Sequence, residues 1–317
     1  MPPAHTAAST RATAASLATW VALVQALRPK QWAKNGMVFL ALLFSVNQYW
    51  SPNDLSTAAR MLLQGAATFV CFSLLASSVY LLNDLQDAPQ DRLHPRKRYR
   101  PIAAGKVPPS LAAGTAVVLG AASLAGSYLV SPALLAVTLG YAVLMAGYSY
   151  GLKNLVIIDV FIIALGFVAR AAGGAVAIGV PISPWLYICT ILGALFLALE
   201  KRRNELTTLK DDAAGHRRNL EEYSPELVDQ MIGVVTSSTV IAYSLYTFTA
   251  DGLPSNHAMM LTVPLVLYGV FRYLFLVHQR NQGGSPEDVL YSDRPLLACI
   301  VLWIAVAAAV LLLFRGG

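Results

Sequence analysis

Long apolar runs constrain this chain more than any other feature. From residue 34 onward they recur at about 20 residues each, with few or no charges. A run of that length crosses the hydrocarbon core of a bilayer, roughly 30 Å thick, as a helix in which every backbone group is paired. Only 13% of the residues are charged, against roughly 25% in a soluble domain. The sequence therefore predicts an all-α integral membrane protein. Nine membrane spans are predicted, at residues 34–50, 58–82, 110–130, 133–150, 155–178, 184–200, 227–250, 258–277 and 296–315.

The connections between these runs differ sharply in charge. Lys and Arg are frequent in one alternating set, at residues 28–34, 84–109, 153, 201–224 and 278–295. They are almost absent from the other set, at residues 51–57, 131–132, 179–183 and 251–257. Because basic loops remain in the cytoplasm, we expect the first set there. The chain is then a multi-pass protein of a bacterial-type inner (plasma) membrane with a cytoplasmic amino terminus.

Residues 1–19 are rich in Ala, Ser and Thr and lack the apolar core of a signal peptide. We expect them to form a disordered cytoplasmic tail, with residues 20–317 as a single transmembrane catalytic domain. Cys71, Cys189 and Cys299 lie far apart in apolar runs, which favours packing roles over a disulfide or a metal site. No nucleotide-binding glycine motif and no motif of a serine or cysteine nucleophile is present in the sequence.

An acidic motif follows the second apolar run. Asn83 precedes three carboxylates, Asp84, Asp87 and Asp91, whose spacing of i, i+3 and i+7 places them on one helix face. Without a cation they would repel one another. Carboxylate oxygens at this density suit Mg²⁺, which binds one or two carboxylates together with substrate phosphates. Mg²⁺ is therefore the predicted metal, with Mn²⁺ as a substitute, and Asn83 is expected to orient a ligand or a phosphate.

A basic run comes directly after the acidic motif and includes Lys97, Arg98 and Arg100. Arg and Lys are the side chains that bind phosphate. Acidic residues for a metal beside basic residues for phosphates predict chemistry on a diphosphate at the membrane surface. The alternative is a solvated acidic face followed by a basic run that only sets topology.

Charged residues also occur at and inside a later apolar run. Lys153 lies at a second cytoplasmic boundary and is expected to neutralise a diphosphate. Asp159 and Arg170 lie within the run itself, where charges are costly and usually functional. They share a helix face, but a rise of about 16 Å prevents a direct pair, so each needs its own partner. A structural ion network within the bundle is the alternative interpretation.

The segment before the first apolar run contains Lys30, Lys34 and Asn35 around Trp32. Such a segment is typical of an interfacial anchor, and it would equally suit a lipid phosphate. Arg203 is a candidate site residue in a loop that is otherwise expected to be solvated. Asp293 and Arg294 fit either a helix cap or a substrate contact.

With these residues in view, the chain resembles the UbiA-type prenyltransferase superfamily. The pattern Asn-Asp-x-x-Asp-x-x-x-Asp at residues 83–91 matches its first aspartate motif. The region 148–153 with Asp159 stands in place of the second motif, with Ile163 where many members have another Asp. The resemblance implies a bundle of nine transmembrane helices with its active site at the cytoplasmic face.

A narrower resemblance is to the decaprenyl-phosphate phosphoribosyltransferase branch. It is carried by residues 28–35, 94–105, 170–174 and 292–295. This resemblance implies transfer of phosphoribose from phosphoribosyl pyrophosphate to a polyprenyl phosphate, with release of pyrophosphate. The product would be a lipid-linked precursor of arabinose donors for cell-wall glycans. The implied partners are these two substrates and the lipid bilayer, with no nucleic acid, and self-association into a homo-oligomer is left open.

The expected site then has three parts. The catalytic and metal-binding part is Asn83, Asp84, Asp87 and Asp91. The part that binds the donor diphosphate and ribose is Lys97, Arg98, Arg100, Lys153, Asp159 and Arg170. The part that binds the acceptor lipid phosphate is Lys30, Lys34 and Asn35.

Three other functions are weighed against this assignment. Prenyl transfer to an aromatic acceptor would use the same fold, but the altered second motif and the long basic run argue against it. A transporter would use Asp159 and Arg170 as buried charges, although no inverted repeat is evident. A membrane scaffold without activity would leave the acidic motif without a role.

Overall fold

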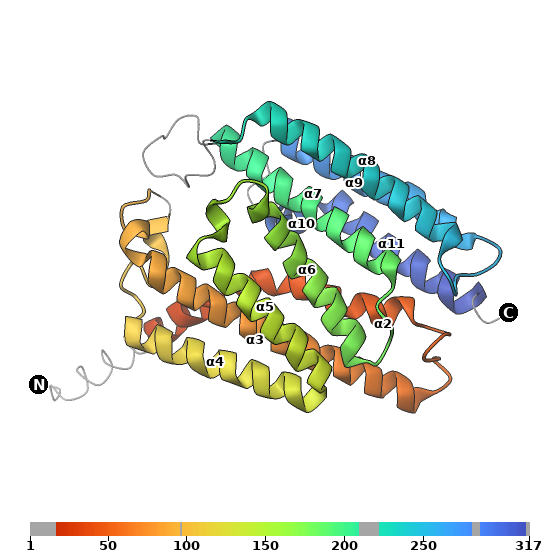
Figure 1. Cartoon of the computed structure of the whole chain (residues 1–317), viewed down its shortest axis with the longest axis horizontal. Coiled ribbons are helices and arrows are strands. Elements are labelled where there is room, and N and C mark those ends of the chain that lie inside the picture. Colours follow the sequence, from red (N-terminus) through yellow and green to blue (C-terminus); the bar gives the residue numbers. More distant parts are fainter. Residues whose placement is uncertain (1–16, 96, 209–221, 281–285, 315–317) are drawn as a thin grey trace, which may run out of the picture.

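The computed structural model describes residues 17–95, 97–208, 222–280 and 286–314, and within these ranges every regular element is a helix (Figure 1). A short helix, Leu17–Ala26, comes first. The 3₁₀ segments are η1 (Pro29–Phe39), η2 (Lys97–Tyr99), η3 (Leu152–Asn154) and η6 (Ala258–Thr262). The α-helices are α2 (Leu40–Phe44), α3 (Leu55–Asp91), α4 (Pro109–Val130), α5 (Pro132–Tyr150), α6 (Ile158–Ala177), α7 (Pro184–Thr208), α8 (Pro225–Thr249), α9 (Val263–Arg280), α10 (Pro286–Ser292) and α11 (Arg294–Phe314).

Eight of the described helices are long and apolar enough to cross a membrane, and they correspond to the second to ninth predicted spans. The predicted all-α membrane fold is therefore confirmed. Several of these helices begin at an N-cap residue, whose side chain accepts a hydrogen bond from a backbone N–H that has no partner within the helix. Asp54 caps α3, Ser131 caps α5 and Ser224 caps α8 in this way.

The predicted count of nine long helices is not confirmed, because the expected first span at residues 34–50 is irregular. It begins inside η1, which has 11 residues, continues through α2, which has 5 residues, and ends in residues 45–50, which lie outside both helices. A 3₁₀ helix rises about 2.0 Å per residue and an α-helix about 1.5 Å, so the pair extends about 30 Å. This segment therefore has the reach of a span without being one regular helix, and it packs against α3 and α6.

Close approach of η1 to α6 depends on a glycine. A Cβ atom on Gly174 would lie 2.0 Å from the carbonyl oxygen of Val38 in η1, which is less than any real contact. Only glycine leaves room for the two backbones at this crossing. The crossing brings η1 beside the α6 residues that lie one turn before Gly174.

The connections fall at two ends of the bundle. Those that join α3 to α4 and α5 to α6 lie at one end, and those that join α4 to α5, α6 to α7 and α8 to α9 lie at the other (Figure 1). This arrangement follows from the alternation of helices and matches the two sets of connections that the charge pattern separated. The acidic motif and Lys153 therefore lie at the same end.

The acidic motif is part of a helix that runs beyond its predicted span. The apolar run was expected to end at residue 82, but α3 continues to Asp91. Ala22 and Leu23 of the helix Leu17–Ala26 belong to one buried cluster with Leu81 and Ala88 of α3, so this helix lies against the end of α3. Residues 1–16 of the expected tail lie outside the described residues, and its last three residues, 17–19, are the start of this helix.

Candidate active site

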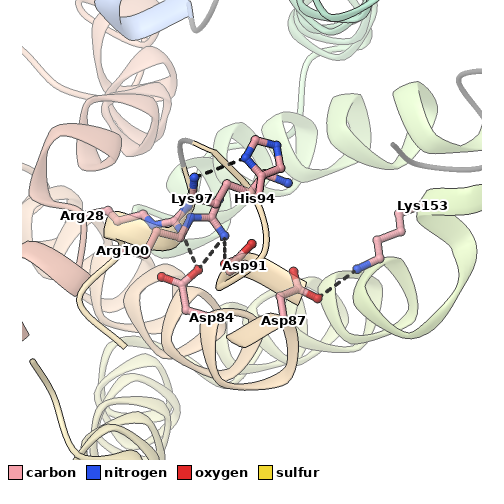
Figure 2. A network of polar contacts seen from close by, with 8 residues as sticks. All are labelled: Arg28, Asp84, Asp87, Asp91, His94, Lys97, Arg100 and Lys153. Carbon is pink, nitrogen blue, oxygen red and sulfur yellow. Dashed lines mark hydrogen bonds and ion pairs between the residues drawn. The ribbon is translucent and has the colours of Figure 1, made fainter. Parts of the chain in front are cut away.

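The acidic motif forms an ion network with two arginines (Figure 2). Asp84 Oδ1 accepts hydrogen bonds from Arg28 Nη2 at 2.5 Å and from Arg100 Nη1 at 3.2 Å. The same Arg100 Nη1 donates to Asp91 Oδ2 at 2.7 Å. Asp84 and Asp91 are 2% and 3% exposed, so their charges depend on these partners. One guanidinium nitrogen thus lies between two carboxylates of one helix face.

The third carboxylate faces the second sequence motif. Asp87, about one third exposed, lies 3.7 Å from Lys153 Nζ, which η3 carries in the connection between α5 and α6 (Figure 2). The two motifs, separated by more than sixty residues in sequence, therefore meet in the fold. Their opposite charges form one polar surface at this end of the bundle.

The basic run contributes unequally to this surface. Arg100 turns towards the carboxylates, whereas Arg98 is exposed and its guanidinium contacts the Tyr99 side chain, with a hydrogen bond of 2.7 Å to its hydroxyl. The exposed Lys97 is held through its backbone N–H, which donates to His94 Nδ1 at 3.3 Å. Asn83 is half-buried beside the network. Within the basic run, Arg100 is the residue that pairs with Asp84 and Asp91.

Arg28 was not singled out from the sequence as a site residue. It precedes η1, pairs with Asp84 and stacks over the Tyr80 ring at 4.9 Å. The signal was present, since Arg28 opens the basic segment before the first apolar run. The sequence predicts an anchor or an acceptor site for that segment, because nothing in the sequence places it next to the acidic motif.

The donor set of this site fits a hard divalent cation. Carboxylate oxygens are the ligands that Mg²⁺ and Mn²⁺ prefer. Arg28 and Arg100 pair with Asp84 and Asp91, so these buried carboxylates already bind positive charge. In the described part of the chain, no three His, Cys, Asp or Glu side chains are already arranged around a common metal position. The guanidinium of Arg100 stands between Asp84 and Asp91 instead.

Asp159 lies away from this network in a buried cluster of its own. It is fully buried, and its Oδ2 pairs with Arg202 Nη2 at 2.8 Å. Its Oδ1 accepts a hydrogen bond of 2.8 Å from the hydroxyl of Tyr223. Neither partner was predicted, although Arg202 belongs to the basic stretch that directly follows an apolar run.

Arg170 and Asn35 form a second buried network. Arg170 Nε donates to Asn35 Oδ1 at 2.7 Å, and its Nη2 donates to the Tyr141 hydroxyl at 2.8 Å. Asn35 Nδ2 donates to Ser73 Oγ at 2.9 Å. As expected from their spacing, Asp159 and Arg170 have separate partners. The contacts of Arg170 and Asn35 join η1, α3, α5 and α6.

Lys30 and Lys34 differ in their surroundings. Lys30 is exposed, whereas Lys34 is half-buried and its Nζ donates to Gln31 Oε1 at 2.6 Å. Lys34 lines a cavity of about 470 Å³ between η1, α7, α9 and α11. Among the described residues that line it, Lys34 is the only charged one. A second cavity of about 620 Å³ shares lining residues with the first, including Met37 and Trp303.

A family model described as the UbiA prenyltransferase family matches residues 37–292. The chain belongs to the UbiA prenyltransferase family. It is 34% identical over 287 residues to the decaprenyl-phosphate phosphoribosyltransferase of Mycobacterium tuberculosis, covering 90% of this chain and 93% of that protein. It is 34% identical over 286 residues to the protein of the same name from Corynebacterium glutamicum, covering 89% and 84%.

Solved UbiA structures share the fold. The structure of a UbiA homologue from Archaeoglobus fulgidus bound to GPP and Mg²⁺ superimposes with a TM-score of 0.67, at 20% identity, over 91% of this chain and 99% of that one. The predicted resemblance to the superfamily and to its phosphoribosyltransferase branch is thus confirmed. This UbiA-family member is a multi-pass membrane transferase.

The two remaining candidate regions of this UbiA-family chain make other contacts. Arg203 Nε donates to Asp229 Oδ1 of α8 at 2.5 Å. Asp293 caps α11 by accepting from the backbone N–H of Leu296 at 2.8 Å, and it pairs with Arg272. The hydrogen bond from Arg272 holds the pKa of the Asp293 carboxyl below its ordinary value. Asp293 is therefore a helix cap.

Proposed function

We propose that this UbiA-family transferase moves phosphoribose from phosphoribosyl pyrophosphate to a polyprenyl phosphate, such as decaprenyl phosphate, and releases pyrophosphate. The observation that carries the proposal is the network in which Arg28, Arg100 and Lys153 meet three carboxylates at one end of the bundle. Carboxylates for a metal and cations for phosphate then stand at one surface. The names of the relatives in Mycobacterium tuberculosis and Corynebacterium glutamicum support the same donor and acceptor.

The donor diphosphate would bind over the acidic motif. Asp84, Asp87 and Asp91 would hold Mg²⁺ or Mn²⁺, which when bound supplies positive charge to the leaving pyrophosphate. Arg100 and Lys153 would turn from the carboxylates to the phosphates, because both side chains already lie at this surface and are partly exposed. Stabilising the charge that develops on the leaving group is the main catalytic task of such a site.

The acceptor would bind with its phosphate near Lys34 and its tail in the apolar cavities. A polyprenyl tail must remain in an apolar environment, while its phosphate needs a cation at the cavity mouth. Lys34 meets both conditions, since it lies on η1 and lines an otherwise uncharged cavity among the described residues. Trp303 and Met37 line both cavities, so a tail could pass from the first to the second.

The proposed reaction needs no strong general base. The bond between the ribose anomeric carbon and the pyrophosphate oxygen breaks, and a bond forms between that carbon and an oxygen of the lipid phosphate. The attacking oxygen is already anionic at neutral pH, so no proton has to be removed from it. The site accordingly needs cations and a metal more than an activated nucleophile. The product is a lipid-linked phosphoribose, a precursor of arabinose donors for cell-wall glycans, made on the cytoplasmic side of the inner membrane.

Product analysis tests this proposal directly. Purified protein in nanodiscs is given radiolabelled phosphoribosyl pyrophosphate, decaprenyl phosphate and Mg²⁺, and labelled lipid is separated by thin-layer chromatography. We expect labelled lipid product that disappears with chelator and returns with Mg²⁺ or Mn²⁺. A parallel reaction contains a polyprenyl diphosphate and 4-hydroxybenzoate. Prenylated aromatic product without labelled lipid would refute the proposal in favour of ordinary prenyl transfer.

A further inference from the structure

A strained turn precedes α6. Ile157 has a φ of 69°, a conformation that is rare for a β-branched residue. The backbone N–H of Ile158 donates to the carbonyl oxygen of Val156 at 2.8 Å, which closes a γ-turn of the uncommon positive-φ form around Ile157. Such a turn persists only when neighbouring groups hold it. The groups that stabilise this turn therefore affect the position of the residues on either side of it.

The hydroxyl of Tyr223 holds this turn. It accepts a hydrogen bond of 2.6 Å from the backbone N–H of Ile157 and donates one of 2.8 Å to Asp159 Oδ1. Asp159 is fixed in turn by Arg202 at 2.8 Å. Tyr223, Asp159 and Arg202 are 5%, 0% and 1% exposed, so water does not replace these contacts. Burial raises the pKa of Tyr223 to about 12, further above neutral pH than that of an ordinary tyrosine, so its hydroxyl remains a donor to Asp159.

The turn sets the place of Lys153. Lys153 lies four residues before Ile157, on η3, and its ammonium group lies 3.7 Å from Asp87. Between η3 and α6 the chain has only Leu155, Val156 and Ile157, so a change in the turn must move η3 or α6. Because α6 packs against α3, α5, α7 and η1, whereas the three-residue η3 packs against α5 and α6, η3 is the less constrained of the two and is the part expected to shift.

We propose that Tyr223 is a positioning residue for Lys153, with Asp159 and Arg202 as its support. The buried cluster holds the γ-turn at Ile157, and the turn presents Lys153 to the acidic motif and to the donor diphosphate. This inference rests on the proposed function. Asp159 then acts at a distance from the reacting atoms, through Tyr223 and the turn, and is not a ligand of the metal at Asp84 and Asp91.

The first test uses Tyr223→Phe, which keeps the ring and removes only the hydroxyl. Losing one buried hydrogen bond that fixes Lys153 should raise the donor KM about fivefold, with the acceptor KM unchanged. Hydrogen exchange should become faster in the peptide that covers residues 151–158. Tyr141→Phe is the matched control, because it also removes a buried hydroxyl that is hydrogen-bonded to an arginine. It should leave the donor KM unchanged.

A double-mutant cycle separates this inference from the proposed function. Lys153→Ala alone should raise the donor KM, and adding Tyr223→Phe to it should raise the donor KM no further. An unchanged donor KM in Lys153→Ala would refute the donor role of Lys153. If Lys153→Ala raises the donor KM as expected but Tyr223→Phe leaves it unchanged, the positioning role of Tyr223 is refuted. The same conclusion follows if the increases in donor KM of the two single variants add fully in the double variant. The donor role of Lys153 would stand in both cases.

A rescue variant keeps the test decisive if Tyr223→Phe is poorly stable. Ile157→Gly adopts a positive φ without strain, and the Ile157 side chain is 44% exposed, so little packing is lost. In the Tyr223→Phe background, Ile157→Gly should lower the donor KM towards the original value and slow exchange in residues 151–158. Recovery of thermal stability without recovery of the donor KM would refute the positioning role.

Discussion

Arg100→Ala separates the two roles that the structure gives to one side chain. Arg100 Nη1 pairs with Asp84 and Asp91, and in the proposed reaction it turns to the donor diphosphate. A lost charge-assisted hydrogen bond to phosphate is worth about 1.5–3 kcal/mol, so the donor KM should rise about 10- to 150-fold. The same substitution removes a cation that competes with the metal for two carboxylates. The concentration of Mg²⁺ required for half-maximal activity should therefore fall.

Arg100→Ala should lower the free energy of unfolding by less than it weakens the binding of the donor. Removing one partner of a buried ion pair costs about 3–5 kcal/mol. The Arg100 side chain is 30% exposed and Asp84 keeps Arg28, so we expect a loss of only about 1–2 kcal/mol. Added Mg²⁺ should recover part of that loss, because it can bind the carboxylates that Arg100 leaves.

The assay measures initial rates in nanodiscs while phosphoribosyl pyrophosphate and Mg²⁺ are varied independently. Arg98→Ala is the matched control, since Arg98 lies two residues away in the same basic run and contacts Tyr99 instead of the acidic motif. It should change neither constant by more than about twofold, which is within the range of an exposed charge. Equal effects of Arg98→Ala and Arg100→Ala would refute the conclusion that only Arg100 acts at the acidic motif. A higher donor KM together with a lower Mg²⁺ requirement in Arg100→Ala would support it.

The remaining predictions concern the metal, the acceptor and pH. Asp84→Asn should keep the fold but reduce turnover a few hundredfold, because an amide lacks the charge that a hard cation requires, and near-normal kcat would exclude Asp84 as a ligand. Lys34→Ala should raise the apparent KM for polyprenyl phosphate about tenfold and leave the donor KM unchanged, whereas the opposite pattern would assign Lys34 to the donor. Asp293→Asn should lower the free energy of unfolding at pH 7 by about 1 kcal/mol, because the amide can still cap α11 but loses the negative charge that pairs with Arg272 and faces the start of the helix. The pKa of Asp293 in the folded protein lies below its ordinary value, so this stabilisation is complete above the unfolded pKa of about 4 and is lost as the pH falls through the folded pKa. The melting temperatures of the original protein and of Asp293→Asn should therefore converge in acid.

Membrane architecture was predictable because a bilayer imposes a local rule on the sequence. A helix needs a fixed length of apolar residues to cross it, and that length is visible in each run without knowledge of its neighbours. The shared helix face of Asp84, Asp87 and Asp91 was predictable for a similar reason, since the α-helical period is constant. The separate partners of Asp159 and Arg170 followed from the rise per residue alone.

The choice among similar residues was not predictable in this way. Arg98 and Arg100 carry the same charge two residues apart, yet only Arg100 contacts the carboxylates, because the fold of the connection after α3 turns one side chain inward. The irregular η1 was missed because its shape depends on packing against α6 at Gly174, which no local pattern records. Tyr223 carried no recognisable motif, and its role follows from contacts with segments more than sixty residues away.

The amino-acid sequence was enough to predict that the chain spans a membrane and that acidic and basic residues gather at the same end of the helices, and its motifs carried the resemblance to UbiA-type enzymes. The membrane spans and the charge distribution depend on the length, period and charge of short stretches, which can be read without knowing the fold. The pairing of Arg28 and Arg100 with Asp84 and Asp91, the enclosure of Asp159 by Arg202 and Tyr223, and the position of Lys34 at an apolar cavity were visible only in the folded chain. These outcomes depend on which helices lie side by side, and that is settled by packing across the whole bundle.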